Sequence, residues 1–168
     1  MPFQRILVPF DFSALAEEGV RLAEQLADAH GAQLDILHIV EEPAFPSFFK
    51  LGAMRIYGMV PDQEKVAWTA LEKRFGTPAE RQDLEFHVVK GASGQEIIRF
   101  ASTREVDLVV ITSHGLSGLQ HVAMGAVAQK VVQMAPCPVL VVKAFDPGRD
   151  QMKEASGDGQ TEQPPASA

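Results

Sequence analysis

Residues 5–13 read Arg-Ile-Leu-Val-Pro-Phe-Asp-Phe-Ser, which predicts the end of a buried strand followed by the beginning of a helix. Residues 5–9 are a short apolar run closed by a proline, a pattern typical of a buried parallel strand whose last residue leaves the hydrogen-bonded ladder. Ser13 stands where a helix N-cap belongs, because its hydroxyl can accept a hydrogen bond from a free backbone N–H. Gly31 can adopt the positive φ of a C-terminal cap. Between Ser13 and Gly31, apolar or small residues recur at helical spacing and predict the buried face of this helix, namely Leu15, Gly19, Leu22, Ala23 and Leu26.

The same strand-and-helix unit then recurs along the chain. Further strands are predicted at residues 34–40, 84–89, 107–112 and 138–143, because each is a short, mainly apolar run. Helices are predicted at about 62–76, from Ser93 to about 103, and at about 118–134, the second opened by a capping box of Ser93 and Glu96. The first of these helices is expected to bury Val66, Ala70, Leu71 and Phe75. The last carries one apolar stripe, made of Leu119, Val122, Ala123, Ala126, Val127, Val131 and Met134.

Five strands alternating with four helices predict an α/β fold, a single doubly wound parallel sheet with helices on both faces. The residues alone leave the strand order open among the few that right-handed crossovers permit. In any doubly wound order, the loops at the carboxyl ends of the strands near the switch point form the ligand crevice.

Composition limits the class of protein. The 168 residues suit one domain, and 15 Lys+Arg against 22 Asp+Glu give a formal net charge of −7, which argues against general binding to nucleic acid or anionic membranes. The one cysteine excludes an internal disulfide and a Cys-rich zinc site. No apolar run approaches the roughly 20 residues that span a bilayer, and the N-terminus lacks the pattern of a signal peptide. We therefore expect a cytoplasmic protein that binds neither nucleic acid nor membrane.

Two segments interrupt the alternation. Residues 41–61 are too long for an ordinary connection and hold Phe45, Phe48, Phe49 and Tyr57. They are either an aromatic-rich excursion packed on its own domain, or a lid or partner contact. Residues 146–168 carry five acids and two bases with almost no apolar bulk, so we expect a domain at 1–145 and a disordered acidic tail at 146–168.

Candidate site residues lie in two loops. Asp11 follows the first strand, where an acid can meet a ribose hydroxyl or a base amine, or can bond nearby backbone N–H groups as a turn aspartate. Gly115 and Gly118 follow the fourth strand and permit close backbone approach to a phosphate. Gly125 falls inside the apolar stripe. Either something packs against its bare backbone, or the helix begins there and its first N–H groups form an anion site.

The remaining motifs do not indicate a further ligand or a reaction. Residues 91–96, Gly-Ala-Ser-Gly-Gln-Glu, lack the Lys-Ser/Thr of a phosphate-binding P-loop. Cys137 is expected to be a small, partly buried hydrophobe. No nucleophile elbow or paired acid and base is apparent, so no catalytic residue is predicted. The histidines show no metal-ligand spacing, so no metal ligand is predicted; they are His30, His38, His87, His114 and His121.

Three segments resemble the universal stress protein family. Residues 5–13 resemble its opening strand and acidic turn. Residues 113–118, Ser-His-Gly-Leu-Ser-Gly, with 124–128, Met-Gly-Ala-Val-Ala, resemble its glycine segment, and 135–142 resemble its last strand. The resemblance covers about residues 1–143. It implies strand order 3-2-1-4-5, a crevice between strands one and four, and a homodimer through residues 138–143.

The resemblance also implies an adenine nucleotide as ligand (ATP, ADP or AMP), with Mg²⁺ as an accompanying ion. Binding members have Gly, two residues, Gly, nine residues, then Gly and Ser or Thr; here these positions hold Thr112, Gly115, Gly125 and Ala126, so two of the four depart. The residues implied for adenosine are Asp11 and Ile39, and Pro9 is a further residue of the implied nucleotide site. Those implied for ribose and phosphates are Thr112, His114, Gly115, Gly125, Ala126 and Val127.

Three functions follow as hypotheses. The first is a cytosolic stress-response protein that senses adenine nucleotide and changes partners, which Asp11, Gly115 and Gly125 favour. The second is a dimeric adaptor of the same family that binds no nucleotide and an unknown protein partner, which Thr112 and Ala126 favour. The third is an enzyme that hydrolyses or transfers an adenylyl or phosphoryl group, which the lack of a base or metal constellation opposes. We expect a binding protein and not an enzyme, with weak nucleotide hydrolysis as the remaining enzymatic possibility.

Overall fold

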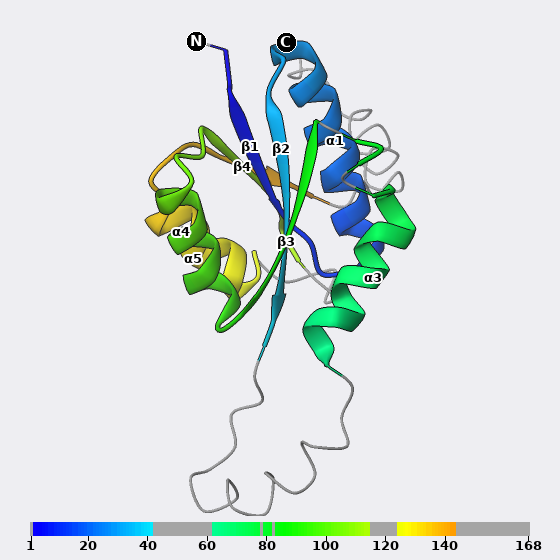
Figure 1. The fold of residues 1–168 in the computed structure, drawn as a ribbon. Coiled ribbons are helices and arrows are strands. Elements are labelled where there is room, and N and C mark those ends of the chain that lie inside the picture. Colours follow the sequence, from blue (N-terminus) through cyan, green and yellow to red (C-terminus); the bar gives the residue numbers. More distant parts are fainter. Residues whose placement is uncertain (1, 42–61, 78, 82, 115–123, 144–168) are drawn as a thin grey trace, which may run out of the picture.

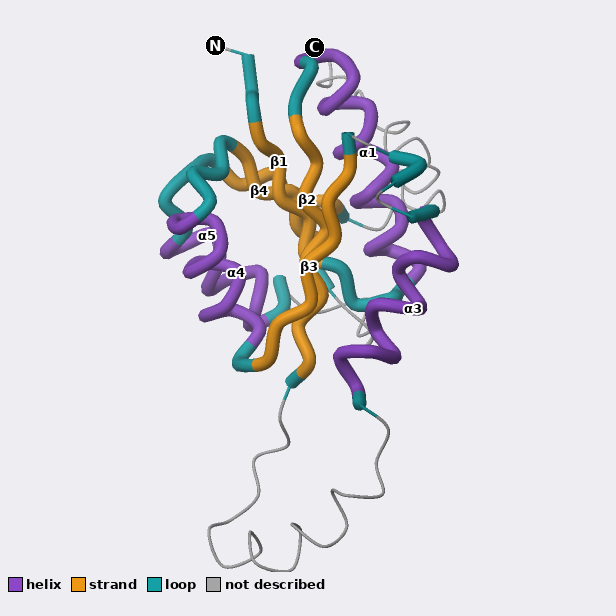
Figure 2. Tube along the Cα trace, in the orientation of Figure 1, coloured by secondary structure: helices purple, strands orange, loops and turns teal. Residues whose placement is uncertain are grey.

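The computed structural model describes residues 2–41, 62–77, 79–81, 83–114 and 124–143. Within them, five strands form one parallel sheet in the order β3-β2-β1-β4-β5, which confirms the expected fold class and strand order. Helices α1 and α3 cover one face and α4 and α5 the other (Figures 1 and 2). The strands are β1 (Arg5–Pro9), β2 (Gln33–Val40), β3 (Leu84–Lys90), β4 (Leu108–Thr112) and β5 (Val139–Val142). The helices are α1 (Ala14–His30), α3 (Gln63–Phe75), α4 (Ser93–Thr103) and α5 (Ala126–Met134).

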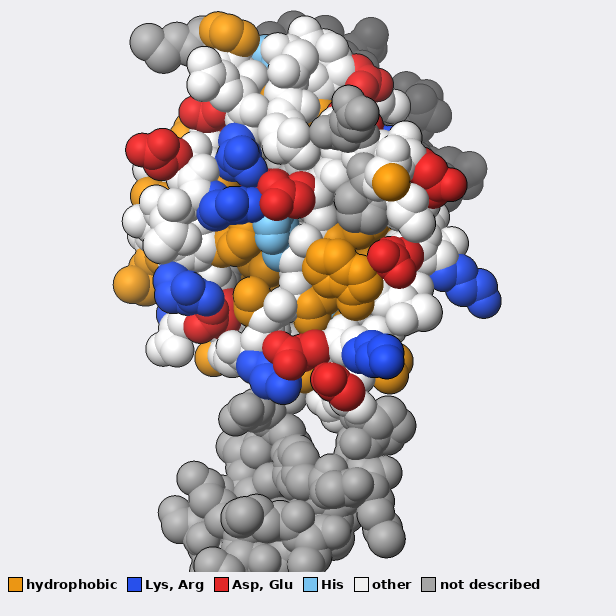
Figure 3. Space-filling model, in the orientation of Figure 1, with side chains coloured by type: hydrophobic (Ala, Val, Ile, Leu, Met, Phe, Trp, Pro, Cys, Tyr) orange, Lys and Arg blue, Asp and Glu red, His pale blue; other side chains and the backbone are white. Residues whose placement is uncertain are grey.

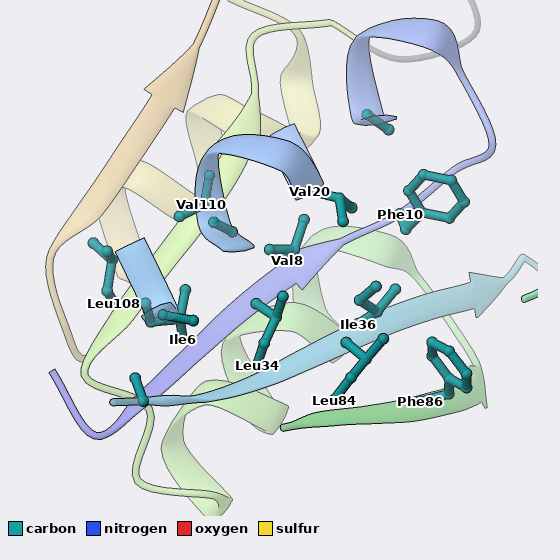
Figure 4. Packing of buried hydrophobic residues seen from close by; sticks show 14 of the residues in the cluster. Ile6, Val8, Phe10, Val20, Leu34, Ile36, Leu84, Phe86, Leu108 and Val110 are labelled. Atoms are coloured by element: carbon teal, nitrogen blue, oxygen red, sulfur yellow. The ribbon is translucent and has the colours of Figure 1, made fainter. Parts of the chain in front are cut away.

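Alternate side chains of the strands enter two separate apolar cores, as a sheet covered on both faces requires. Figure 4 shows one set from β1 to β4, together with Val20 of α1, packed in a single layer: Ile6, Val8, Leu34, Ile36, Leu84, Phe86, Leu108 and Val110. The opposite set packs against α4 and α5 and includes Leu7, Leu37, Val109 and Ile111. No helix among the described residues is long and apolar enough to cross a membrane.

The buried faces of the helices differ from those predicted. On α1 the prediction was right for Gly19 and Ala23, but small residues fill the rest of the buried face, which comprises Ala16, Gly19, Val20, Ala23 and Ala27. On α3 the prediction was right for Leu71, and Phe75 is partly buried against the same core, whereas Val66 is 56% exposed and Ala67, which was not predicted, is buried. Small residues let a helix backbone approach the sheet closely, and this constraint outweighs the preference for large apolar side chains.

The start of α1 is as predicted, and the start of α4 is not. The Ser13 hydroxyl accepts a 3.1 Å hydrogen bond from the N–H of Ala16, and Gly31 has a φ of 66° as the C-cap of α1. In α4, however, Ala92 is the N-cap and makes no side-chain cap bond. The Ser93 hydroxyl instead donates to a carboxylate oxygen of Glu41 at 2.5 Å. The predicted capping box is therefore wrong, because the Ser93 hydroxyl bonds to the carboxylate of Glu41, just after β2, and does not cap α4.

A buried ion pair joins the amino-terminal parts of the first three strands. Asp35 of β2 is 0% exposed, and Nη1 of Arg5 on β1 donates to its Oδ2 at 2.8 Å. Nε2 of His87 on β3 lies 3.3 Å from the other oxygen. Arg104, just after α4, donates to Glu85 of β3 at 2.8 Å. Figure 3 shows basic and acidic side chains gathered around a histidine on the face that β3 crosses.

The ionised form of Asp35 is expected to stabilise the fold. Burial alone raises the pKa of Asp35, but hydrogen bonds from His87 and Arg5 and the charge of Arg5 outweigh burial and lower it below the ordinary value. A lowered folded-state pKa gives stability that is complete above the unfolded pKa of about 4 and is lost as pH falls through the folded pKa. Asp35→Asn should therefore cost about 3 kcal/mol at neutral pH, since it removes the buried carboxylate that bonds Arg5 and leaves the guanidinium with the more exposed Glu85 at 3.8 Å.

Denaturant titrations at several pH values provide the check on Asp35. The free energy of unfolding of Asp35→Asn should fall less steeply than that of wild type below about pH 4. Equal slopes for the two proteins would show that the carboxylate does not contribute in this way.

Leu71 and Val66 offer a test of which face of α3 is turned to the core. Leu71→Ala should cost about 2–4 kcal/mol, because Leu71 is fully buried and its truncation leaves a cavity. Val66→Ala should change stability by no more than about 0.5 kcal/mol, because the side chain is mostly exposed. Chemical unfolding of both variants against wild type measures the difference, and a similar loss in both would contradict the helix orientation.

Candidate functional site

The candidate site lies where the central strand of the sheet ends. β1 stands between β2 and β4, and its last pairing to β2 joins Pro9 to Leu37. β2 continues beyond this point to Val40. Because parallel strands end at the same edge of a sheet, the turn after β1, the end of β2 and the segment after β4 share one edge.

The turn after β1 is held by its own acid. Asp11 accepts a 3.0 Å hydrogen bond from the N–H of Ser13, so the turn-aspartate role is present in the structure. Phe12 follows with a φ of 63°, a left-handed conformation that costs a non-glycine residue roughly 1–2 kcal/mol. Its ring packs edge-on against Phe10 and His38, with centroids 5.1 and 4.8 Å away. These contacts hold the turn, and with it the half-buried Asp11, at the end of β1.

The end of β2 directs polar backbone groups to the side that β1 has left. In β2, alternate residues bond to β1: the N–H of Gln33 donates to Gln4 at 2.8 Å, and the carbonyl of Leu37 accepts from Phe10 at 2.8 Å. Ile39 is the next residue in this series. Its N–H and C=O therefore face the β1 side, at a level where β1 has already ended. Ile39 can thus offer one donor and one acceptor side by side.

The segment after β4 leads to the start of α5. Of the two alternatives for Gly125, the second is right: Gly125 is the N-cap and α5 begins at Ala126, so the predicted helix at about 118–134 starts too early. The N–H of Gly125 donates to the carbonyl of Ser113 at 2.8 Å, and a Cβ on Gly125 would lie 3.3 Å from the same oxygen. Close packing is therefore one reason for glycine here. The first N–H groups of a helix have no intrahelical partner, so those of Ala126 and Val127 are suited to an anion.

The other predicted site residues have mixed surroundings. Thr112 ends β4, and its methyl group packs on α1, where a Cβ on Gly19 would lie 3.4 Å from it. Nδ1 of His114 lies 3.0 Å from the hydroxyl of Ser113. That spacing resembles a nucleophile and its base, but Ser113 is buried and its hydroxyl is withheld from a substrate. Gly115 and Gly118, the excursion at 41–61 beyond Glu41, and the tail at 146–168 lie outside the described residues.

A cavity of about 570 Å³ adjoins the same end of β2 on its α3 side. Its volume is within the range of small-molecule pockets. Neither Asp11 nor Gly125 lines it, so it is not the predicted crevice. The lining is mainly apolar and consists of Phe12, His38, Ile39, Val40, Glu41, Gln63, Val66, Ala67 and Ala70.

A mixed cluster of metal-donor groups, missed in the sequence, lies nearer the amino ends of the strands. Donor atoms of Asp35, Glu85 and His87 lie within 4.8 Å of one another. Arg5 and Arg104 already neutralise the two carboxylates. Each guanidinium would repel a divalent ion by roughly 7 kcal/mol at about 4.5 Å and an effective dielectric constant of about 20. We therefore assign the cluster to the fold. The signal that could have found it is the alternation that places Glu85 and His87 on one face of β3.

Cys137 is partly buried, as predicted from the sequence. Burial, together with the charge of Asp107, raises the pKa of its thiol. A raised pKa keeps the thiol protonated at neutral pH, where the thiolate would be the nucleophile.

Comparison with known proteins gives the family. The family model of the universal stress protein family matches residues 2–143. A universal stress protein of Bacillus subtilis is 30% identical over 147 residues, which cover 84% of this chain and 99% of that protein. UspA of Lactobacillus plantarum has a structure with a TM-score of 0.68 at 26% identity, covering 84% and 99% of the two chains. A universal stress protein in complex with cAMP has a TM-score of 0.54 at 26% identity, covering 84% and 98%. The chain belongs to the universal stress protein family.

Proposed function

We propose that this protein is a cytoplasmic regulatory protein of the stress response that binds an adenine nucleotide and changes its protein partners accordingly. The observation that carries the proposal is the backbone of Ile39, whose N–H and C=O face the side that β1 has left. The role that we propose is binding, because the hydroxyl of Ser113 is buried although Nδ1 of His114 lies 3.0 Å from it.

The backbone of Ile39 suits adenine better than guanine. Along its Watson–Crick edge, adenine has an exocyclic N–H donor beside a ring-nitrogen acceptor, which complement a carbonyl and an N–H respectively. Guanine has the reverse order and would set acceptor against acceptor and donor against donor. A site that leaves buried polar groups unpaired with the wrong ligand discriminates strongly against it. The proposed ligand is therefore adenosine-based.

The rest of the nucleotide has complementary groups nearby. The carboxylate of Asp11, at the end of β1, suits a ribose hydroxyl. The start of α5 offers N–H groups and the positive end of the helix dipole to phosphates. Mg²⁺ would enter with the phosphates as their counter-ion. The relative whose structure contains cAMP supports adenine nucleotides as the ligand class.

One observation favours a second function, the dimeric adaptor that binds no nucleotide. Ala126 stands first in α5, where binding members of the family have a hydroxyl. Thr112 departs from the family glycine as well, but its methyl group packs against α1. The missing hydroxyl at Ala126 is therefore the stronger argument for the adaptor.

Two substitutions separate these functions. Ala126→Ser supplies a hydroxyl for a phosphate and should tighten ATP binding by up to roughly 10- to 150-fold, the value of one hydrogen bond to a charged group. Gly125→Val places a branched side chain at the phosphate site and should abolish binding. Isothermal calorimetry with ATP, ADP and AMP measures both, with circular dichroism as the folding control. If neither wild type nor Ala126→Ser binds at millimolar ligand, the adaptor function stands.

A homodimer through β5 is the second part of the proposal. β5 lies at the edge of the sheet, and Leu140 is 37% exposed. The carbonyls of Pro138 and Val142 bond to the β4 side, so the N–H of Val141 faces outward, where a second β5 can pair with it.

Val141→Pro tests this edge, because it removes an outward N–H and keeps the bonds to β4. Light scattering at micromolar concentration should give a dimer mass for wild type and a monomer mass for this variant, with circular dichroism as the folding control. A monomeric wild type would refute the edge-to-edge dimer.

A further inference from the structure

His38 makes an unusual contact with the end of β1. Its Nδ1 lies 2.8 Å from the carbonyl oxygen of Phe10. A carbonyl oxygen only accepts hydrogen bonds, so Nδ1 carries the hydrogen and donates it. The ring is held in place by Phe12, which packs edge-on against it at 4.8 Å. A side chain of β2 thus satisfies a backbone group of the neighbouring chain segment.

The carbonyl of Phe10 is also the next acceptor in the ladder between β1 and β2. The N–H of Phe10 donates to the carbonyl of Leu37 at 2.8 Å. In a regular parallel ladder, the following bond would run from the N–H of Ile39 back to the carbonyl of Phe10. Among the described residues that bond is not made, and His38 occupies the acceptor.

Burial of the Phe10 carbonyl makes a hydrogen-bond partner necessary. Phe10 is 2% exposed, and a buried carbonyl without a partner is costly. Two groups on β2 can supply that partner, the ring of His38 or the N–H of Ile39. Because the ring supplies it, the ladder can end at Phe10 without an unsatisfied carbonyl.

We propose that His38 is a positioning residue: by bonding the carbonyl of Phe10, it stops the ladder and keeps the N–H of Ile39 available to an adenine base. Its effect on adenine rests on the proposed function, whereas its effect on the ladder does not. His38 acts through the backbone and is not required to touch the nucleotide.

Two variants separate the hydrogen bond from the ring. His38→Phe keeps an aromatic ring against Phe12 but cannot donate. His38→Asn loses the ring but keeps a donor nitrogen at the position of Nδ1. If the ring matters only for packing, His38→Asn should change the exchange of the Ile39 amide and the binding of ATP. If the hydrogen bond matters, as proposed, His38→Phe should change them.

The first measurement needs no ligand. Amide hydrogen exchange of Ile39, followed by NMR in the nucleotide-free protein, should slow roughly 10-fold in His38→Phe as its N–H takes the carbonyl of Phe10. His38→Asn should exchange like wild type. An unchanged Ile39 amide in a folded His38→Phe would overturn the proposal, and so would slow exchange in both variants.

The second measurement compares ATP with GTP by calorimetry on the full chain. His38→Phe should weaken ATP binding roughly 3- to 10-fold and narrow the preference for ATP over GTP, and His38→Asn should restore both. Equal ATP-to-GTP ratios in wild type and His38→Phe would refute the role in base selection. If wild type binds neither nucleotide, the proposed function fails, while the exchange measurement still decides whether His38 ends the ladder.

Discussion

Two parallel strands can share backbone hydrogen bonds only as far as the shorter one extends, and here β1 ends at Pro9 while β2 continues to Val40. The difference leaves the N–H and C=O of Ile39 on the β1 side, beyond the last ladder bond to β1. Asp11 lies in the turn after β1, and Gly125 lies in the segment after β4. Because the carboxyl ends of parallel strands meet at one edge of the sheet, these candidate residues belong to the same edge.

Close packing explains the glycines at two positions next to β4 and the segment that follows it. Gly19 of α1 lies against Thr112, and Gly125 lies against the carbonyl of Ser113. A side chain at either position would meet atoms at or near van der Waals contact. The same requirement accounts for the small residues on the buried face of α1. Thr112 therefore fits as a packing residue, even though it departs from the family motif.

Much of the fold could be predicted from the sequence because short apolar runs and capping residues are local signals. The strand ends agree with the structure to within one residue, and the caps Ser13 and Gly31 were predicted. The strand order was not in the local signals and came from the resemblance. The helix faces were partly wrong because hydrophobicity does not report how closely a helix lies to the sheet. The capping box at Ser93 failed because Glu41, remote in the sequence, competes for the serine.

The candidate site could be predicted only in part, for the same reason. Asp11 and the helix start at Gly125 follow from turn and glycine patterns. The cluster of Arg5, Asp35 and His87 depends on which residues of three strands stand at the same level. The role of His38 depends on a ladder bond that is replaced. Neither can be read from one segment alone.

The two ends of the sheet differ in how their polar groups are satisfied. At the amino-terminal end, Asp107 accepts from the N–H groups of Gln4 and Arg5 at 2.7 and 2.9 Å, and the guanidinium of Arg5 neutralises Asp35. These groups satisfy one another, so they stabilise the fold and leave little for a ligand. At the carboxyl end, the N–H and C=O of Ile39 instead lie on the β1 side beyond the last ladder bond that the described residues make, and α5 begins at Ala126. A ligand gains most where the protein has not already paired its own polar groups, and this is why function is expected at the carboxyl end.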